Sequence, residues 1–458
     1  MGKVEHVVVL MLENRSLDSL LGRLYPQSAQ FDGLAGDESN PWHKPDGSVE
    51  EIPVWNSPAL TPDAARLPDP EPGELFSDVQ MQLFGLGGEP DAAPAMSGFV
   101  DNYARQPPPT HPVDPRGVMH YFTPEQLPVI NGLARAFAVT DRWHAAAPCE
   151  TWPNRYFAHC GTAGGWVNND RSRFPYQWPR TMPTIFRRLG AHGHSWRVNF
   201  HDLPQTATLF DLWPKIPTHF CLFEEEFERH ARTGRLPNYS FIEPRYFPGL
   251  LSDEPPNDQH PPHNLLFGEQ LIARVYNAVR AAPTWPRTLF VVTYDEHGGC
   301  FDHVPPPAAV PPGGPYPDGF RFDRYGVRVP AVIVSPYVAP GSIVRPPPPY
   351  PFDHASIPAT LQRLFASGPP LTPRVAAAPD LLCALTLERP DNHGPARIAY
   401  DPRRPDRAEL AAYRRRRHNR HQQNLRHPSL ALPAAIAGIT GVVRGLGARL
   451  VPEDWRRR

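Results

Sequence analysis

Two pairs of oxygen-bearing side chains stand directly after two strongly apolar stretches of the sequence. Asp295 and Glu296 follow residues 290–293, and Glu13 and Asn14 follow the run VVVLML. Adjacent carboxylates repel each other unless a proton or a cation lies between them, so the first pair predicts a divalent metal. Glu13 and Asn14 alone would fit a helix cap equally well. Two strand ends that both carry oxygen ligands favour the metal.

Thr151 is a further candidate site residue. It begins the segment TWPNRYFAHC, which predicts a helix, because proline is tolerated in a first helical turn. At the start of a helix, exposed N–H groups and the helix dipole stabilise a phosphate or an ionised hydroxyl. The alternative from these residues alone is that Thr151 only caps the helix.

The elements that must position these residues alternate along the chain. Apolar runs predict strands at 4–14, 136–141, 290–293 and 327–335. Helical spacing predicts helices at 16–24, 76–84, 123–135 (with Thr123 as N-cap), 267–281 and 356–365. This order predicts an α/β fold with a mostly parallel central sheet, helices on both faces and long Pro-rich surface loops over 27–115. In such sheets ligands bind beyond the carboxyl ends of the strands.

Composition narrows the function classes. The chain has 458 residues, a net charge of −1 and 62 prolines, and nothing in this balance points to nucleic acid as a partner. Five scattered cysteines without a CxxC pair argue against a disulfide framework and a thiolate zinc site. The short apolar run near the N-terminus leads straight into Glu13 and does not resemble a signal peptide. We therefore expect a cytoplasmic protein.

The C-terminal part differs in kind. We divide the chain into a catalytic domain, 1–400, and an extension, 401–458, which carries 14 arginines and 5 acidic residues. Within it a basic run at 413–426 precedes an apolar stretch at 430–450 that Pro433 and Arg444 interrupt. This order fits peripheral contact with an anionic membrane. The alternative is a solvated helix followed by a segment packed on the catalytic domain.

Five motifs occur together and in order. They are HVVVLMLENRSLDSLLG, CETWPNRYFAHCGT, NDQHPP, VVTYDEHGGCFDHVPPP and YPFDHASI. In this combination the chain resembles the bacterial phosphoesterase family of phospholipases C and acid phosphatases, over about residues 4–385. The resemblance implies an alkaline-phosphatase-like fold.

The resemblance also implies a ligand set for one divalent metal ion, placed on this sequence at Glu13, Asn14, Thr151, Asp295 and Glu296. All five are oxygen ligands. Such a set favours Mg²⁺, Mn²⁺ or Ca²⁺ and also admits Zn²⁺.

Catalytic histidines of the family fall on His260 and His354, which would contact phosphoryl oxygens or protonate the leaving group. A family histidine is replaced by Glu74, which disfavours a doubly charged phosphomonoester, and His201 is the candidate that compensates. The candidate substrate-binding residues are therefore His120, Asn154, His201 and Glu74.

The function that the resemblance implies is metal-dependent hydrolysis of phosphodiesters, in the manner of a phospholipase C. Thr151 would attack phosphorus and form a phosphothreonine intermediate that water then cleaves. The substrate would be a phospholipid or a smaller phosphoester. Two alternatives remain open: an acid phosphatase acting on phosphomonoesters, and a catalytically silent relative that binds a phosphorylated ligand or a membrane.

Overall fold

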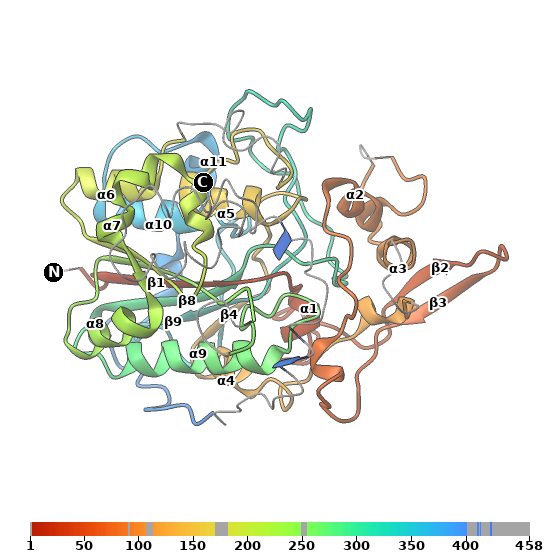
Figure 1. Cartoon of the computed structure of the whole chain (residues 1–458), viewed down its shortest axis with the longest axis horizontal. Coiled ribbons are helices and arrows are strands. Elements are labelled where there is room, and N and C mark those ends of the chain that lie inside the picture. The colour runs from red at the N-terminus through yellow and green to blue at the C-terminus, as the bar shows by residue number, and fades with distance from the viewer. Residues whose placement is uncertain are drawn as a thin grey trace, which may run out of the picture.

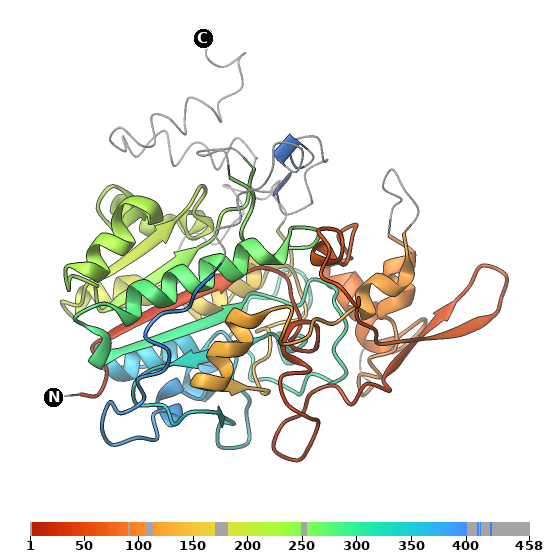
Figure 2. The same ribbon diagram turned by 90° about the horizontal axis from the view of Figure 1, so that it is seen from below.

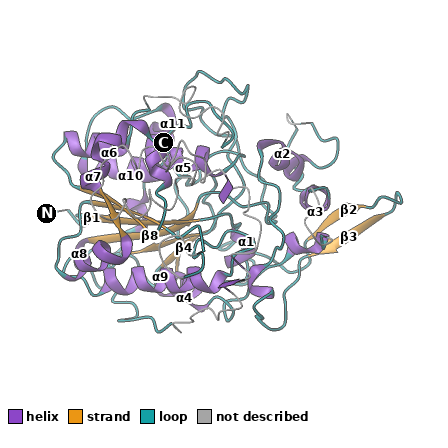
Figure 3. Cartoon of the chain, viewed as in Figure 1, coloured by secondary structure: helices purple, strands orange, loops and turns teal. Residues whose placement is uncertain are grey.

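The structure is a computed structural model of the chain. It describes residues 2–89, 92–106, 113–169, 182–248 and 254–400, and the single residues 410, 411, 413, 422 and 423. Strands and helices alternate around one large sheet, with helices above and below it in the view of Figure 1. Figure 3 shows the same arrangement, with the strands lying between helical layers.

The strands form a large sheet of eight and a separate hairpin of two in the described part of the chain. The strands are β1 His6–Leu12, β2 Ser39–His43, β3 Val49–Pro53, β4 Ala138–Thr140, β5 Trp196–Phe200, β6 Phe220–Leu222, β7 Tyr239–Glu243, β8 Thr288–Tyr294, β9 Ala331–Val334 and β10 Ser342–Ile343. The large sheet has the order β10-β4-β9-β8-β1-β7-β5-β6, and β9 runs antiparallel to both its neighbours. The predicted α/β fold with a mostly parallel sheet is confirmed.

Helices of the described residues cover both faces of this sheet, which Figure 2 shows from the side of α9, while α2 and α3 lie to one side of it. They are α1 Leu17–Leu21, α2 Phe76–Phe84, α3 Phe99–Ala104, α4 Pro128–Ala136, α5 Thr151–Cys160, α6 Ile185–Ala191, α7 Ile216–His219, α8 Glu228–Arg232, α9 Leu265–Arg280, α10 Ser356–Phe365 and α11 Pro373–Ala377. β1 and β8 lie at the centre and are buried almost throughout, as expected for parallel strands covered on both faces.

The helix predicted at 123–135 begins later than expected. Leu127 has φ −121° and ψ 67°, outside the helical region, because it precedes Pro128. Pro128 then occupies the first turn of α4. Thr123 is therefore not the N-cap, and its N–H donates to Gln126 Oε1 at 2.9 Å instead.

The segment 27–115 is more ordered than the prediction of surface loops around one short helix. It contains the β2–β3 hairpin and the helices α2 and α3. Of these elements, the sequence predicted only α2. The apolar residues of these elements form their own hydrophobic cluster, the small cluster, which includes Ile52, Val79, Leu83, Phe99 and Tyr103. In Figure 1 these elements lie to one side of the large sheet.

Little of the predicted C-terminal extension falls within the described residues. Tyr413 and Gln422 pack against the rest of the chain: the Asn264 N–H donates to the Tyr413 hydroxyl at 3.0 Å, and Gln422 Nε2 donates to the Tyr246 carbonyl at 2.6 Å. The apolar stretch at 430–450 and most of the basic run lie outside the described residues, so membrane contact and the domain division stay predictions. In the part that the structure describes, no helix has the length and apolar character needed to cross a bilayer.

Candidate active site

The two acidic strand ends lie side by side. β1 and β8 are parallel neighbours with Leu12 opposite Tyr294, so Glu13 and Asp295 leave the sheet together. The Asn14 N–H donates to Asp295 Oδ1 at 3.0 Å. Asn14 has φ 53°, a left-handed conformation that asparagine tolerates better than most residues. It is not a helix cap, because Ser16 caps α1.

Arg155 joins the start of α5 to this edge of the sheet. Its Nη2 donates to Glu13 Oε1 at 2.6 Å and its Nε to Asp295 Oδ2 at 3.2 Å, and all three side chains are buried. Thr151 is the first residue of α5 and Glu150 its N-cap. Residues four apart share one face of a helix, so Thr151 lies on the face that Arg155 turns toward the carboxylates.

Three of the predicted ligand atoms are buried without a hydrogen-bond partner among the residues that the structure describes. They are Asn14 Oδ1, Thr151 Oγ1 and Glu296 Oε1. Most buried polar atoms in folded proteins have a partner, and leaving one unpaired costs about 1–3 kcal/mol. The three oxygens come from the ends of β1 and β8 and the start of α5, which meet at one edge of the sheet.

Two carboxylates at this edge, those of Glu13 and Glu296, have pKa values well above the ordinary value for glutamate. Burial raises the pKa of Glu13 well above its ordinary value, with Arg155 opposing the rise and Asp295 adding to it. Burial likewise raises the pKa of Glu296, and the charges of Glu74 and Asp295 add to that rise. Additional positive charge at this edge would favour the ionised forms.

The glycine pair after Glu296 lets the loop that follows β8 pack closely. Gly298 has φ +62°, and a Cβ there would lie 2.4 Å from the Asn14 carbonyl oxygen. Gly299 has φ +68°, and its Cβ would lie 2.6 Å from Pro72 Cβ and 2.8 Å from the Gly73 carbonyl oxygen. The loop thus fits between Asn14 and the segment that carries Glu74.

Glu74 and His260 lie beside the ligand set. Asn14 Nδ2 donates to Glu74 Oε2 at 2.5 Å, and His260 Nε2 lies 3.4 Å from the same oxygen. Because the amide nitrogen of Asn14 faces Glu74, its Oδ1 is turned away from that carboxylate. Both predicted residues are thereby in the site, although no substrate contact tests their roles.

His354 and Asn154 have contacts that position other groups. His354 Nε2 donates to the Asp295 carbonyl at 2.5 Å, and Trp143 Nε1 donates to His354 Nδ1 at 3.2 Å. Burial lowers the pKa of His354 to about 4, so the ring is neutral. Asn154 bonds the backbone of Ala147 and Cys149 and holds the loop before Thr151.

His120 and His201 are engaged elsewhere. His120 Nε2 accepts from the Ser57 N–H at 3.0 Å, and its ring packs against Trp55 and Phe122. His201 Nδ1 donates to the Glu243 carbonyl at 2.8 Å, and its ring stacks on Phe223. Substrate contact by either histidine stays a prediction.

Gln205 and Arg155, which both donate to Glu13, were not predicted as site residues from the sequence. Gln205 Nε2 donates to Glu13 Oε1 at 2.7 Å, and the Gln205 N–H donates to Glu243 Oε2 at 2.5 Å. Glu243 ends β7, so its carboxylate fixes the turn that presents Gln205 to Glu13. No motif surrounds Gln205, whereas the spacing of Arg155 from Thr151 could have indicated the role of the arginine.

The expectation of several free N–H groups at the start of α5 is wrong in part. The Trp152 N–H donates to Asn169 Oδ1 at 2.8 Å, and Pro153 has no N–H. The helix dipole still places positive potential near Thr151.

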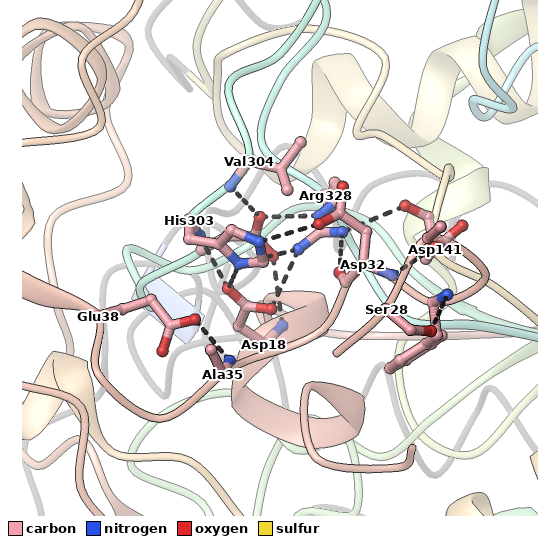
Figure 4. Close-up of polar contacts among 12 residues, drawn as sticks. Asp18, Ser28, Asp32, Ala35, Glu38, Asp141, His303, Val304 and Arg328 are labelled. Carbon is pink, nitrogen blue, oxygen red and sulfur yellow. Dashed lines mark hydrogen bonds and ion pairs between the residues drawn. The ribbon is translucent and has the colours of Figure 1, made fainter. Parts of the chain in front are cut away.

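The described residues contain two groups of carboxylate and histidine atoms close enough to hold an ion: Glu71, Glu74 and His260, and Asp18, Asp302 and His303. In the second group Arg328 already supplies the positive charge. Its Nη2 donates to Asp18 Oδ1 at 3.0 Å and its Nε to Asp302 Oδ1 at 2.8 Å. Figure 4 shows Arg328 among Asp18, Asp32 and His303, so this group is an ion-pair network.

Comparison with known proteins identifies the family to which the chain belongs. The model of the phosphoesterase family matches residues 4–367. Non-specific phospholipase C3 of Arabidopsis thaliana is 36% identical over 418 residues, which cover 88% of this chain and 77% of that protein. Non-hemolytic phospholipase C of Pseudomonas aeruginosa is 28% identical over 436 residues, which cover 85% of this chain and 58% of that protein.

The chain is a phosphoric ester hydrolase by class. It belongs to the phosphoesterase family, as the resemblance implied. Among solved structures, a protein of the alkaline phosphatase superfamily from Vibrio parahaemolyticus aligns with a TM-score of 0.32 and 13% identity, over 52% of this chain and 60% of that one.

Proposed function

We propose that this protein is a divalent-metal-dependent phosphodiesterase of the phospholipase C kind, with Thr151 as its nucleophile. The observation that carries the proposal is the buried Thr151 hydroxyl, which has no partner among the described residues and stands at the start of α5, the helix whose Arg155 donates to Glu13 and Asp295. A threonine that served only as a helix cap would accept a bond from a backbone N–H of the first turn. Glu150 occupies the cap position here.

The residues present fit one hard divalent ion. Asn14 Oδ1, Thr151 Oγ1 and Glu296 Oε1 are buried oxygens without described partners, and the carboxylates of Glu13 and Asp295 lie beside them. An all-oxygen set suits Mg²⁺, Mn²⁺ or Ca²⁺ and admits Zn²⁺. When bound, such an ion lowers the pKa of a coordinated hydroxyl and offsets negative charge on a phosphoryl oxygen.

The chain's own residues hold the reacting groups in place. Arg155 fixes the carboxylates of Glu13 and Asp295, His354 fixes the Asp295 carbonyl, and Asn154 fixes the loop before α5. Thr151 Oγ1 forms a bond to phosphorus while the bond from phosphorus to the leaving alkoxide breaks. The alkoxide leaves as an alcohol after taking up a proton in exchange for the one lost by Thr151. Water then attacks phosphorus, the bond from phosphorus to Thr151 Oγ1 breaks, a phosphomonoester is released, and a proton from the water restores the threonine hydroxyl.

His260 is the histidine placed to help the leaving group. Both ring nitrogens of His354 are engaged with Asp295 and Trp143, whereas His260 Nε2 faces Glu74. Burial alone would lower the pKa of His260, but the hydrogen bond and charge of Glu74 outweigh it and raise that pKa to about 10. Positive charge at His260 would stabilise the departing alkoxide.

A phosphodiester is the proposed substrate class, and a phospholipid the proposed member. Similarity to proteins named non-specific phospholipase C supports the phospholipid. Glu74 supports the diester, because a buried carboxylate beside Asn14 leaves less positive charge for the second negative charge of a phosphomonoester than a histidine there would.

The first prediction tests both the metal and the nucleophile. After EDTA treatment, hydrolysis of p-nitrophenylphosphorylcholine should stop, and Mg²⁺, Mn²⁺ or Ca²⁺ should restore it, with less turnover of p-nitrophenyl phosphate. Thr151→Ala should lower kcat at least ~10³-fold, because no other group would form the covalent intermediate. Initial rates with each ion measure both effects.

Thr151→Ser and the exposed Thr233→Ala serve as controls. Serine keeps a hydroxyl and should retain measurable activity, and Thr233→Ala should behave as wild type. Full activity in Thr151→Ala would remove the nucleophile. Preference for the monoester would make the protein a phosphatase, and ion binding without turnover of either ester would make it a silent relative.

A further inference from the structure

A second group of potential ligands adjoins the five oxygens. Glu71 and Glu74 precede α2, and His260 lies between β7 and α9; one ligand atom from each lies within 4.8 Å of the other two. Glu74 is 2% exposed and His260 1%, while the Glu71 side chain is 18% exposed. The group is therefore nearly buried, with access from one side at Glu71.

The spacing within this group is that of ligands around an ion. His260 Nε2 lies 3.4 Å from Glu74 Oε2 and 3.9 Å from Glu71 Oε1. Both are longer than a short charge-assisted hydrogen bond, which measures about 2.7–2.9 Å, so the His260–Glu74 hydrogen bond is a long one. Ligands each about 2.1 Å from a shared ion lie about 3.0 Å apart at a right angle and about 4.2 Å apart on opposite sides. Both distances fall within that range.

His260 is oriented as a metal ligand would be. Its Nδ1 lies 2.6 Å from the Pro261 carbonyl oxygen. A carbonyl can only accept, so Nδ1 carries the proton and Nε2 is the nitrogen turned toward the carboxylates. Metal-binding histidines commonly donate their other ring N–H to a backbone carbonyl in this way.

Glu74 has an oxygen left over for an ion. Its Oε2 accepts from Asn14 Nδ2, while its Oε1 is buried and has no hydrogen-bond partner within the described part of the chain. The bond to Asn14 also fixes where this group stands. Asn14, a ligand of the proposed first ion, donates to Glu74 of this group, so the two ion sites would be neighbours. Paired ions in two-metal enzymes lie about 3.5–4 Å apart.

We propose that Glu71, Glu74 and His260 bind a second divalent cation, of the borderline class to which Zn²⁺ and Mn²⁺ belong. One nitrogen and two carboxylates suit these ions better than Ca²⁺. The inference rests on the proposed function, because the second cation would supply, in place of a proton on His260, the positive charge opposite the leaving alkoxide.

The test is the number of ions that the full chain binds. The protein is stripped with chelator, dialysed against Zn²⁺ or Mn²⁺ and assayed for bound metal by mass spectrometry. Wild type should hold about two ions per chain, since each site binds one. Glu71→Gln should lower this by about one, and Glu296→Gln should remove the other ion. The exposed Glu89→Gln is the matched control and should hold the wild-type number.

The outcomes separate this inference from the proposed function. One ion in wild type, kept in Glu71→Gln and lost in Glu296→Gln, would overturn the second site and leave the metal-dependent phosphodiesterase intact. No bound ion in wild type would overturn both. Anomalous scattering from crystals grown with Mn²⁺ or Zn²⁺ needs no variant: a peak between Glu71, Glu74 and His260 supports the site, and a peak only at Glu13 and Asp295 overturns it.

Discussion

Arg155 places a permanent positive charge between two buried carboxylates at the end of the central strands. Glu13 and Asp295 both accept from its guanidinium, and Gln205 provides Glu13 with a further donor. Removing one member of a buried ion pair typically costs about 3–5 kcal/mol, because the other members are left uncompensated. Arg155 is thus a positioning residue whose charge lets the carboxylates of Glu13 and Asp295 lie close to each other.

Arg155→Met should lower the free energy of unfolding by about 3–5 kcal/mol in EDTA. Millimolar Mg²⁺ or Mn²⁺ should restore part of this loss, because a divalent cation would replace the missing charge. Urea titrations with EDTA and with each ion measure both effects. The exposed Arg187→Met is the control. Equal loss with and without ion would contradict the proximity of an ion to Glu13 and Asp295.

The sequence indicated the candidate ligands but not the residues that hold them in place. Glu13, Asn14, Asp295 and Glu296 were found because they directly follow apolar runs, and the register of β1 with β8 brings them together. Gln205 reaches Glu13 only through the turn fixed by Glu243, a contact between residues far apart in the chain. The contacts of His354 with Asp295 and Trp143 are of the same kind.

Among the elements, the loop after β8 depends most on close packing. Gly298 and Gly299 insert it between Asn14 and the segment before α2. Local patterns predicted β1, β8, α2 and α10 well, because strand and helix periodicity is strong there. The start of α4 was misplaced because Pro128 keeps the preceding residue out of the helix, an effect that apolar periodicity does not reveal.

Gly298→Ala should abolish most activity and lower stability. The new Cβ would stand 2.4 Å from the Asn14 carbonyl oxygen, so that Asn14 or the loop must shift. Gly193→Ala is the matched control: Gly193 has φ +77°, with no atom within 4 Å of the added Cβ. The control should lose only about 1 kcal/mol, the cost of the left-handed backbone, and should keep its activity. Activity retained in Gly298→Ala would show that the contact tolerates movement.

At the scale of the whole molecule, an ion-pair network joins segments that are far apart in the chain, namely α1, the loop after β8 and the segment before β9. Arg328 joins Asp18 of α1 to Asp302, and His303 Nδ1 donates to Asp18 Oδ2 at 2.6 Å (Figure 4). Burial opposes a charge on His303, but hydrogen bonds to Asp18 and Asp32 outweigh it and raise the pKa of His303 to about 10.

This raised pKa makes part of the stability depend on pH. His303 keeps its proton in the folded chain up to about pH 10, whereas the unfolded chain releases it near the ordinary value of about 6.5. The contribution is therefore complete below about pH 6.5 and is lost as the pH rises through about 10. His303→Gln should cost about 1–3 kcal/mol at pH 6 and clearly less at pH 10. Urea unfolding at both values checks this, and an equal cost at both would contradict a charged His303.

The topology of the large sheet could not be predicted from the sequence. Alternating elements predicted its class, but neither the order of strands nor the reversal of β9 follows from local pattern. The hairpin β2–β3 was missed because segment 27–115 is rich in proline and turn residues, which mask short strands.

The small cluster gives segment 27–115 a hydrophobic interior of its own, made largely by residues of that segment. The same segment delivers Glu71 and Glu74 to the site, while the ends of β1 and β8 and the start of α5 deliver Glu13, Asp295 and Thr151. The two carboxylates before α2 and the groups around Thr151 thus come from different stretches of the chain, each with its own packing. A substitution within the small cluster can therefore move Glu71 and Glu74 while the ends of β1 and β8 and the start of α5 keep their places.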